Sequence, residues 1–385
     1  MNAALVFWLC VAITAYAYAG YPLLVMLLAR RSGRAPTTAS PADRSSGIAD
    51  WPSLTVVVAA HNEAPRIAAR VRDILAQAYP ADRLQIRVVD DGSTDATAHE
   101  AALQDPRVRV ISLPCNRGKA EALNAAMVGI TTDLVVFTDA RQCFAADALR
   151  QLVRPFADPA IGAVSGELVI RTTDADSLAE GVGLYWRMEK ALRFNEARLG
   201  WLHGVSGAIH AIRAGLFRPM PAGTVLDDMW IPMQVLLGGH RVWMARDAIA
   251  WDSASAQPGE EFARKLRTLA GNWQLLARLP VLISPWRNPV FLAWFSHKFL
   301  RLLVPWALLA ALVSCALAPG PLYRTLFVLQ LVGYAWAAAG LWFPKLAARV
   351  PLLPAAGTFL MLNLAALLAL PASLAWQPSQ LWKRH

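Results

Sequence analysis

The stretch VVDDGSTD (residues 88–95) lies where an apolar run gives way to a polar turn. The residues before it, 84–89, are mostly apolar and have the length of a buried strand. Asp-Gly-Ser after a strand is typical of a turn that leads into a helix, and in isolation this stretch is equally well an ordinary turn and helix cap. The segments on either side decide its interpretation.

Segments typical of strands and of helices alternate on both sides of this turn. The strand-like segments are 54–60, 84–89, 108–113 and 134–137, and the helix-like segments are 64–78, 94–103 and 119–129. This alternation predicts an α/β domain with a mainly parallel sheet. Ligands of such sheets bind at the carboxyl ends of the strands, and the polar clusters of this chain fall at those ends.

Three acidic clusters stand out along the chain. They are residues 90–95, then Asp139, then the pair Asp227 and Asp228. Carboxylates at strand ends can bind a metal ion or act as a general base. Each cluster alone also fits a plain role, such as a turn, a helix cap or an exposed helix start. Their order in one chain is more informative than any one of them.

The two ends of the chain are far more apolar than its middle. Apolar residues make up 56% of the sequence and charged residues 17%, against roughly a half and a quarter in soluble domains. Residues 3–29 carry no charge, and Arg30 and Arg31 follow them, which predicts a retained membrane anchor over 1–31 rather than a cleaved signal. The positive-inside rule then places the following residues in the cytosol. Residues 32–50 are predicted to form a linker before a domain at 51–285.

Apolar blocks at about 302–318, 325–343 and 352–374 predict further membrane spans within a region 304–385. Residues 286–303 mix aromatic and basic side chains, as does a helix that lies in the membrane interface. Four crossings would leave the C-terminus outside, whereas the basic residues 383–385 favour the cytosol, so its side is undecided. The net charge of +10 collects beside apolar stretches, which favours lipid contact over nucleic acid.

Four motifs in sequence order resemble those of glycosyltransferase family 2: VVVAAHNE (56–63), VVDDGSTD (88–95), NRGKAEALN (116–124) and FTDA (137–140). The resemblance runs from about residue 54 to 280. The flanking apolar segments resemble its membrane-bound branch, which includes cellulose, chitin, hyaluronan and poly-N-acetylglucosamine synthases. It implies a Rossmann-like GT-A domain, an inverting hexosyl or N-acetylhexosaminyl transfer, and Mg²⁺ or Mn²⁺. The implied partners are a nucleotide-sugar donor, with UDP favoured, and a glycan or lipid-linked acceptor.

The resemblance also implies roles for single residues. Asp91 would contact the nucleotide base, Asp139 the metal ion, and Asp228, beside Asp227, would be the general base. The implied nucleotide-binding residues are Ala59, Ala60, Glu63, Asp91, Lys119, Asp139 and Arg141. The implied acceptor-side residues are Gly204, Ser206, Gly207 and Trp273, and Arg267 would stabilise the leaving diphosphate. His203 is the only histidine that we expect to line the site.

Two positions depart from the family pattern. The metal-binding Asp-x-Asp element is Asp139-Ala140-Arg141, so a cation replaces the second ligand. Arg141 either contacts the diphosphate or turns outward while Asp139 binds the metal alone. In the QxxRW element of processive members, Arg267 is kept, but Thr268 replaces the Trp that stacks on the acceptor sugar. Trp273 either substitutes for it or is a core or interfacial residue, so processive synthesis is in doubt.

The favoured hypothesis is a glycosyltransferase of the inner membrane that acts in cell-surface polysaccharide or exopolysaccharide synthesis, with its catalytic domain in the cytosol. Transfer of a single sugar to a lipid acceptor is the alternative within this class. A transporter is less well supported, because residues 325–343 and 355–374 contain no ionisable side chain apart from Tyr334. A sugar-binding protein with an inactive transferase domain also remains open. The sequence does not define sugar, linkage, metal dependence, partner subunits or oligomeric state.

Overall fold

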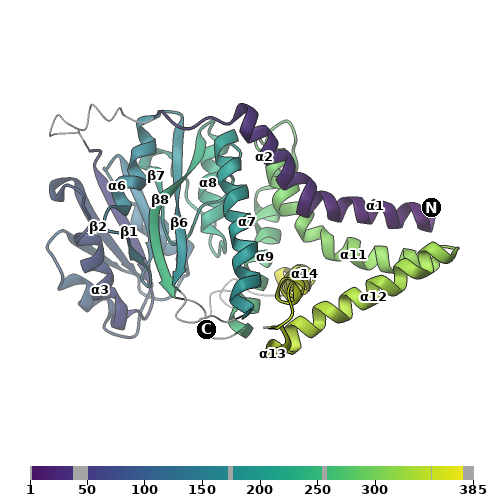
Figure 1. The fold of residues 1–385 in the computed structure, drawn as a ribbon. Coiled ribbons are helices and arrows are strands. Elements are labelled where there is room, and N and C mark those ends of the chain that lie inside the picture. Colours follow the sequence, from purple (N-terminus) through teal and green to yellow (C-terminus); the bar gives the residue numbers. More distant parts are fainter. Residues whose placement is uncertain (1, 38–50, 172–176, 254–257, 348, 376–385) are drawn as a thin grey trace.

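A computed structural model describes residues 2–37, 51–171, 177–253, 258–347 and 349–375. The protein has two parts that lie side by side (Figure 1). One part is built around a β-sheet. The other is a group of long apolar helices. The helix α7 (Ser177–Leu199) runs between the two parts and contacts α2 on one side and β8 on the other.

The sheet has eight strands in the order β3-β2-β1-β4-β7-β6-β8-β5. Its strands are β1 (Leu54–Ala60), β2 (Leu84–Asp90), β3 (Val108–Ser112), β4 (Leu134–Asp139), β5 (Cys143–Phe144), β6 (Ile161–Arg171), β7 (His210–Arg213) and β8 (Arg241–Ser253). The first four in the order are parallel, and β7 lies antiparallel between β4 and β6. The predicted α/β class is confirmed, and the antiparallel strand adds a mixed half that the sequence did not indicate.

Helices pack on the sheet through apolar faces. In α3 (Ala64–Leu75), Ile67, Val71 and Ile74 are fully buried, which is the i, i+4, i+7 spacing of one helix face. The other helices of this part are α4 (Thr97–Ala102), α5 (Lys119–Met127), α6 (Ala148–Val153), α8 (Asp227–Leu237) and α9 (Pro258–Arg278).

The register of the parallel strands sets where polar residues emerge. Ala60 on β1 pairs with Asp90 on β2, and Ala59 pairs with Asp139 on β4. The carboxyl ends of these strands therefore finish level with one another. The loops that carry Asp91 and Asp139 open onto the same edge of the sheet, as expected for a parallel α/β fold.

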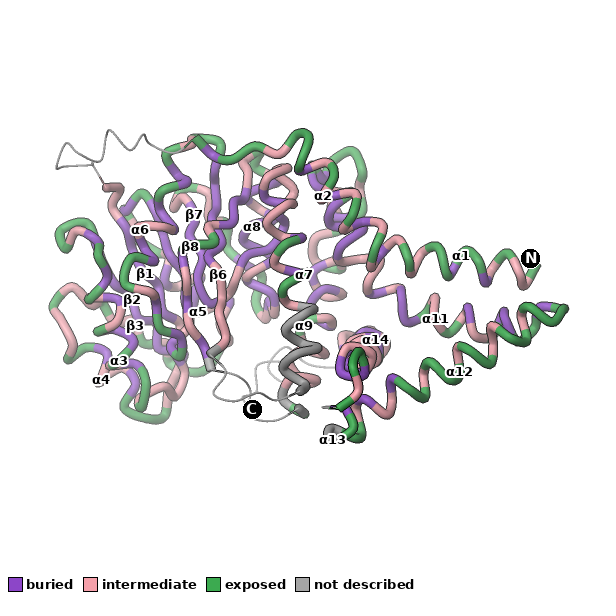
Figure 2. Tube along the Cα trace, viewed as in Figure 1, coloured by how far each residue is buried: buried purple, intermediate pink, exposed green. Residues whose placement is uncertain are grey.

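Four helical segments are long and apolar enough to cross a membrane. They are Ala3–Ser32, Phe291–Leu317, Pro321–Trp342 and Leu353–Ala375, with mean hydropathy values of 1.8, 2.0, 1.4 and 1.9. They comprise α1 (Ala3–Ala15) with α2 (Tyr21–Ser32), α10 (Phe291–Trp294) with α11 (Leu300–Leu317), α12 (Pro321–Trp342) and α14 (Leu353–Ala375). Figure 2 shows that α12 is largely exposed, whereas the strands of the sheet are largely buried. Its exposed residues include large apolar ones, as expected of a surface that faces lipid.

The segment 286–303, expected to be a separate interfacial helix, is arranged differently. The helix starts at Phe291 and continues without interruption to Leu317, so this segment supplies the first turns of a candidate span. Residues 295–299 form a wider π-helical turn, and residues 16–20 form another in the first span. The two wide turns meet, because the hydroxyl oxygens of Tyr16 and Ser296 are 3.0 Å apart. Such turns often occur at functional positions.

Candidate active site

Asp91 holds the loop before α5. Its two carboxylate oxygens each accept a hydrogen bond, at 2.8 Å, from the backbone N–H groups of Arg117 and Gly118. The adjacent Gly92 has a φ of +64°, and a Cβ there would lie 2.3 Å from the backbone of Cys115. Only glycine allows so close an approach. Asp91, which the sequence analysis expected to contact the nucleotide base, is 2% exposed and holds this loop in place through its two backbone contacts.

The other residues expected around the nucleotide lie at the same sheet edge. Ala60 is buried, Ala59 is partly buried, and Glu63 forms an ion pair with Arg66. Asn62, which sequence reasoning missed, joins the first two strand-end loops. Its backbone is left-handed (φ 51°), and its side-chain oxygen accepts from the backbone N–H of Thr94 at 2.8 Å. The signal was its place in the HNE sequence directly after a strand.

Lys119, at the start of α5, joins two of the acidic clusters. Its Nζ lies 2.8 Å from Oδ1 of Asp139 and 3.0 Å from Oδ2 of Asp227. Burial acts to lower the pKa of Lys119, but the two carboxylates outweigh burial and raise it. Burial acts to raise the pKa of Asp139, but the charge of Lys119 holds it below its ordinary value. Lys119 and Asp139 are therefore both charged at neutral pH.

Asp228 has the opposite electrostatic environment. Burial and then the negative charge of Asp227 raise its pKa to about 6. A carboxyl group with a pKa near the working pH suits a general base. Its backbone oxygen accepts from the N–H of Val205 at 2.9 Å, which ties the start of α8 to the loop 203–207.

The loop expected on the acceptor side packs against this acid. The Cβ of a residue at position 207 would lie 3.9 Å from Oδ2 of Asp228 and 3.9 Å from Nζ of Lys119. At Gly204 it would lie 2.5 Å from Sδ of Met229. The backbone N–H of Ser206 donates to Oγ of Ser165 on β6. The loop therefore lies beside Asp228 and Lys119, and it is tightly packed at Gly204, whereas a Cβ at position 207 would make only ordinary contacts.

The two candidate arginines lie in different surroundings. Arg141 is 53% exposed and forms an ion pair with Asp252 at 3.0 Å. Arg267 is more buried, which lowers its pKa, while Asp228, Asp139 and Asp227 oppose the shift. Arg267 thus lies within range of the charges of all three acids. Arg141 pairs with Asp252 rather than with Asp139. Its charge also lowers the pKa of Asp139, but burial and Lys119 have larger effects on that pKa.

His210, on β7, was missed by sequence reasoning. Its ring stacks on Phe137 at 5.2 Å, its Nδ1 donates to the backbone oxygen of Ser206, and burial lowers its pKa to about 4. Its Nε2 is buried without a hydrogen-bond partner. The sequence around His210 gives no sign of a site residue. His210 reaches the site only because β7 inserts between β4 and β6, out of chain order.

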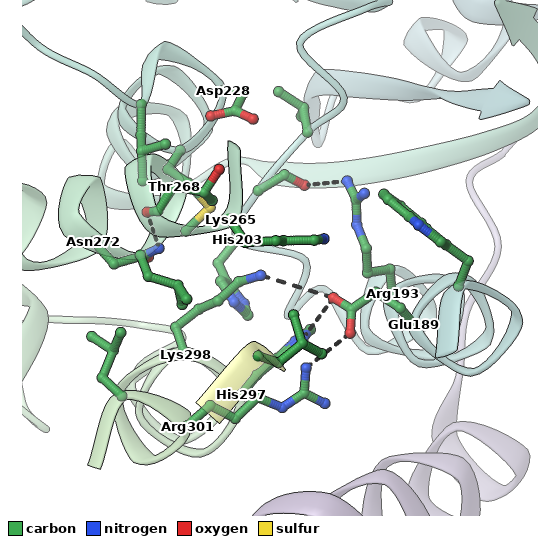
Figure 3. A pocket seen from close by; sticks show the side chains of 18 of the residues that line it. Glu189, Arg193, His203, Asp228, Lys265, Thr268, Asn272, His297, Lys298 and Arg301 are labelled. Carbon is green, nitrogen blue, oxygen red and sulfur yellow. Dashed lines mark hydrogen bonds and ion pairs between the residues drawn. The ribbon is translucent and has the colours of Figure 1, made fainter. Parts of the chain in front are cut away.

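A cavity of about 310 Å³ leads from Asp228 to the apolar helices. Figure 3 shows Asp228 at one side and Lys298 and Arg301 at the other, with His203 between them. His203 lines the cavity as expected, and burial lowers its pKa to about 3. The walls come from α7, α8, α9, α11 and α14, so the cavity lies at the junction of the two parts of the protein.

A buried ionic network forms the floor of this cavity. His297 lies between Glu189 and Glu196 of α7, with each ring nitrogen 2.8 Å from a carboxylate oxygen. Arg301 also binds Glu189, and the hydroxyl of Tyr21 donates to Glu196 at 2.7 Å. Burial acts to raise the pKa of both glutamates, but their interactions with His297 and with the other groups around them outweigh burial and lower it. The network therefore links α7 to two candidate membrane spans, Ala3–Ser32 through Tyr21 and Phe291–Leu317 through His297 and Arg301.

Trp273 is not among the residues that line the cavity, although its chain neighbour Asn272 is. Its ring contacts Phe299 at 6.1 Å and packs against Ala369 and Ala372 of α14. This is the core or interfacial role that the sequence left open. A different tryptophan, Trp186 of α7, lines the cavity, with Nζ of Lys265 5.0 Å from its ring centroid.

The donor set fits a divalent cation only in part. Asp139 is the one carboxylate that the altered element offers, its side chain is 36% exposed, and one of its oxygens contacts Lys119. Mg²⁺ is often held by one or two carboxylates together with substrate phosphates, and Asp139 supplies one such carboxylate. Glu196, His203 and His297 also bring three ligand atoms within 4.8 Å of one another. Both nitrogens of His297 already bind carboxylates there, so we assign that cluster to the ionic network.

Comparison with known proteins places this fold in one family. The model of "Glycosyl transferase family 2" matches residues 55–219. An N-acetylglucosaminyltransferase of Rhizobium leguminosarum bv. trifolii is 35% identical over 155 residues, which are 39% of this chain and 82% of that protein. The chain belongs to glycosyltransferase family 2, and its sheet is that of the GT-A fold.

Two further likenesses concern larger parts of the chain. An N-acetylglucosaminyltransferase of Rhizobium sp. (strain N33) is 30% identical over 250 residues, 60% of this chain and 55% of that protein. The chain spans about half the length of the first curated relatives it matches. The solved structure of mannosyltransferase PcManGT from Pyrobaculum calidifontis, in complex with GDP-Man and Mn²⁺, has a TM-score of 0.69 and 25% identity. That likeness covers 96% of this chain and 99% of the other, so it includes the apolar helices.

Proposed function

We propose that this protein transfers a sugar, with inversion at the anomeric carbon, from a nucleoside-diphosphate sugar to an acceptor hydroxyl beside the membrane. One observation carries the proposal: Asp228, with a pKa near 6, lies where the Lys119–Asp139–Asp227 cluster meets a cavity that leads to the apolar helices. The donor then lies over the strand ends and the acceptor enters from the cavity. Several relatives are N-acetylglucosaminyltransferases, which favours UDP-N-acetylglucosamine as donor.

The proposed reaction is a single in-line displacement. The acceptor oxygen forms a bond to the anomeric carbon while the bond from that carbon to the diphosphate oxygen breaks. The hydroxyl proton passes to Asp228, and the nucleoside diphosphate leaves with the electron pair of the broken bond. Lys119 and Arg267 stabilise the negative charge of the diphosphate. Asp139 would hold Mg²⁺ or Mn²⁺, which supplies further positive charge to the diphosphate when bound.

The apolar helices and the charges beside them support a cellular location for the protein. The exposed Arg30 and Arg31 lie in the last turn of α2, which is the part of the first candidate span nearer to the sheet domain (Figure 1). Under the positive-inside rule this domain faces the cytosol, where nucleotide sugars are made. We place the protein in the cytoplasmic membrane, with a membrane-linked acceptor in cell-surface glycan synthesis.

A donor panel tests the proposal. Membranes that contain the protein are given radiolabelled UDP-N-acetylglucosamine, UDP-glucose or GDP-mannose, with and without a chelator, and the products are sized. We expect one donor to label a product that partitions with lipid. The Asp228→Asn variant should lose at least about a hundredfold in turnover while it still binds UDP. Turnover unchanged by Asp228→Asn would show that Asp228 is not the base.

A further inference from the structure

The cavity beyond Asp228 is rich in cations. Its lining includes Arg193, Arg264, Lys265, Lys298 and Arg301, against three carboxylates. Two of those carboxylates, Glu189 and Glu196, already bind His297. Arg193 donates to the backbone oxygen of Gly204 at 3.1 Å, and Nζ of Lys298 is 3.9 Å from its nearest carboxylate oxygen. Arg193 and Lys298 therefore keep hydrogen-bonding capacity for an anion, and Figure 3 shows them on either side of His203.

The same cavity has an apolar wall towards the membrane. Leu302 of α11 and Leu362 and Ala366 of α14 form this wall, with Tyr18 of the first span. Bilayer hydrocarbon lies beside such helices if they span. A ligand here meets cations at one end and apolar side chains at the other.

A second cavity, of about 520 Å³, lies among the apolar helices near the first one. On two helices, the residues that line the second cavity lie about one helical turn from residues that line the first. Thr14 and Ala15 are one turn from Tyr18, and Phe359 is one turn from Leu362. Tyr18 of the first cavity and Phe359 of the second are in ring contact, with centroids 5.3 Å apart, so the two cavities lie on either side of this aromatic pair. The lining of the second cavity contains no Asp, Glu, Lys, Arg or His among the described residues. A glycan chain needs hydrogen-bond partners along its length, whereas this cavity suits hydrocarbon.

We propose that the acceptor is carried by an amphiphilic lipid phosphate, with its phosphate bound by Arg193 and Lys298 and its hydrocarbon chain in the second cavity. This inference rests on the proposed function and names its acceptor class. Arginine and lysine bind phosphate through charge-assisted hydrogen bonds. The sugar hydroxyl that follows the phosphate then lies in the part of the cavity that Asp228 lines.

Direct binding tests the proposal without any turnover. The full protein in dodecylmaltoside micelles is titrated with tritiated undecaprenyl phosphate and, separately, with tritiated undecaprenol. We expect undecaprenyl phosphate to bind at least about tenfold more tightly than undecaprenol, because even one charge-assisted hydrogen bond to the phosphate accounts for that difference. Inorganic phosphate should compete only weakly, because it lacks the chain. Equal binding of the alcohol, or equal competition by inorganic phosphate, would overturn the proposal.

Matched variants separate the two ends of the site. Arg193→Gln with Lys298→Gln should weaken undecaprenyl phosphate binding at least about tenfold, whereas Arg324→Gln, an exposed cation on α12, should not. Gly333 lines the second cavity, and a Cβ there would meet nothing within 4 Å. Gly333→Phe should therefore fill the cavity and weaken binding, whereas Val332→Phe, on an exposed neighbour, should leave it unchanged.

UDP binding is measured on each variant as a check of the fold. A variant that binds UDP normally but has lost the lipid supports the lipid site. Normal lipid binding in both sets of variants would refute that site while leaving sugar transfer by Asp228 intact. A wild-type protein that binds the lipid but transfers no sugar would overturn the proposed function and leave the lipid site standing.

Discussion

The ammonium group of Lys119 lies 2.8 Å from a carboxylate oxygen of Asp139, although Lys119 begins α5 and Asp139 ends β4. The same ammonium group is 3.0 Å from Asp227, at the start of α8. Three elements from distant parts of the chain are thus held by one cation. Lys119 is 10% exposed, so water screens this cluster little.

Replacing Lys119 by methionine should destabilise the protein and weaken donor binding. Removing one partner of a buried ion pair leaves carboxylates without compensation, at a cost of about 3 kcal/mol. For a domain of this size, that lowers the melting temperature by roughly 5–10 °C. Thermal unfolding in detergent and UDP titration check this, with Lys119→Arg as a charge-preserving control. An unchanged melting temperature with unchanged UDP affinity would contradict the role given to Lys119.

The activity should depend on pH through Asp228. A general base works in its ionised form, and burial followed by the charge of Asp227 raises the pKa of Asp228 to about 6. We therefore expect kcat/KM to fall as pH drops below about 6 and to level off above it. In the Asp227→Asn variant the neighbouring charge is gone, so the midpoint should move to lower pH. Rate profiles at fixed ionic strength measure both, and a midpoint that does not move would rule out the coupling.

Gly92→Ala should damage the nucleotide site. The left-handed φ disfavours alanine, and its Cβ would lie 2.3–2.6 Å from backbone atoms of Cys115 and Asn116. The loop that Asp91 holds must then move. We expect UDP affinity to fall at least about tenfold. Gly129→Ala is the control, because φ is also positive there but a Cβ meets nothing within 4 Å. Equal UDP affinity in the two variants would count against this explanation.

Arg70→Met should lower stability more than Arg72→Met on the same helix. Arg70 is 2% exposed, forms an ion pair with Asp73, donates to Oγ1 of Thr138 at 2.7 Å and lies over the ring of Phe144. Arg72 is exposed. We expect the melting temperature to fall by roughly 5–10 °C for Arg70→Met and by little for Arg72→Met. Similar values for both variants would show that the contacts of Arg70 contribute little.

Local patterns were enough to predict the parallel half of the fold. Strand, turn and helix follow one another from residue 54 to 139. The strands β1 to β4 pair in parallel, and the carboxylates lie where these strands end. The antiparallel strand β7 could not be predicted in this way. It is four residues long and pairs with β4 and β6 through backbone hydrogen bonds that its short sequence does not specify.

The candidate site was predictable in its residue types but not in its contacts. Sequence indicated Asp91, Lys119, Asp139 and Asp228, yet it did not indicate that Asp91 binds backbone N–H groups or that Lys119 lies between two acids. It offered Trp273 for the acceptor side, whereas Trp273 packs against α14 and Trp186 lines the cavity. His203 was expected there, but its neighbour His297 was not.

The sequence by itself therefore determined the elements of the parallel half of the sheet, the strand-end acids and the apolar helices, because each depends on residues that are close along the chain. Only the tertiary structure decided which charges meet. The pKa of Asp228 depends on burial and on Asp227, and the cation-lined cavity depends on α7, α9 and two candidate spans meeting at one place. Such long-range contacts follow from how whole elements pack, and no local pattern of residues records them.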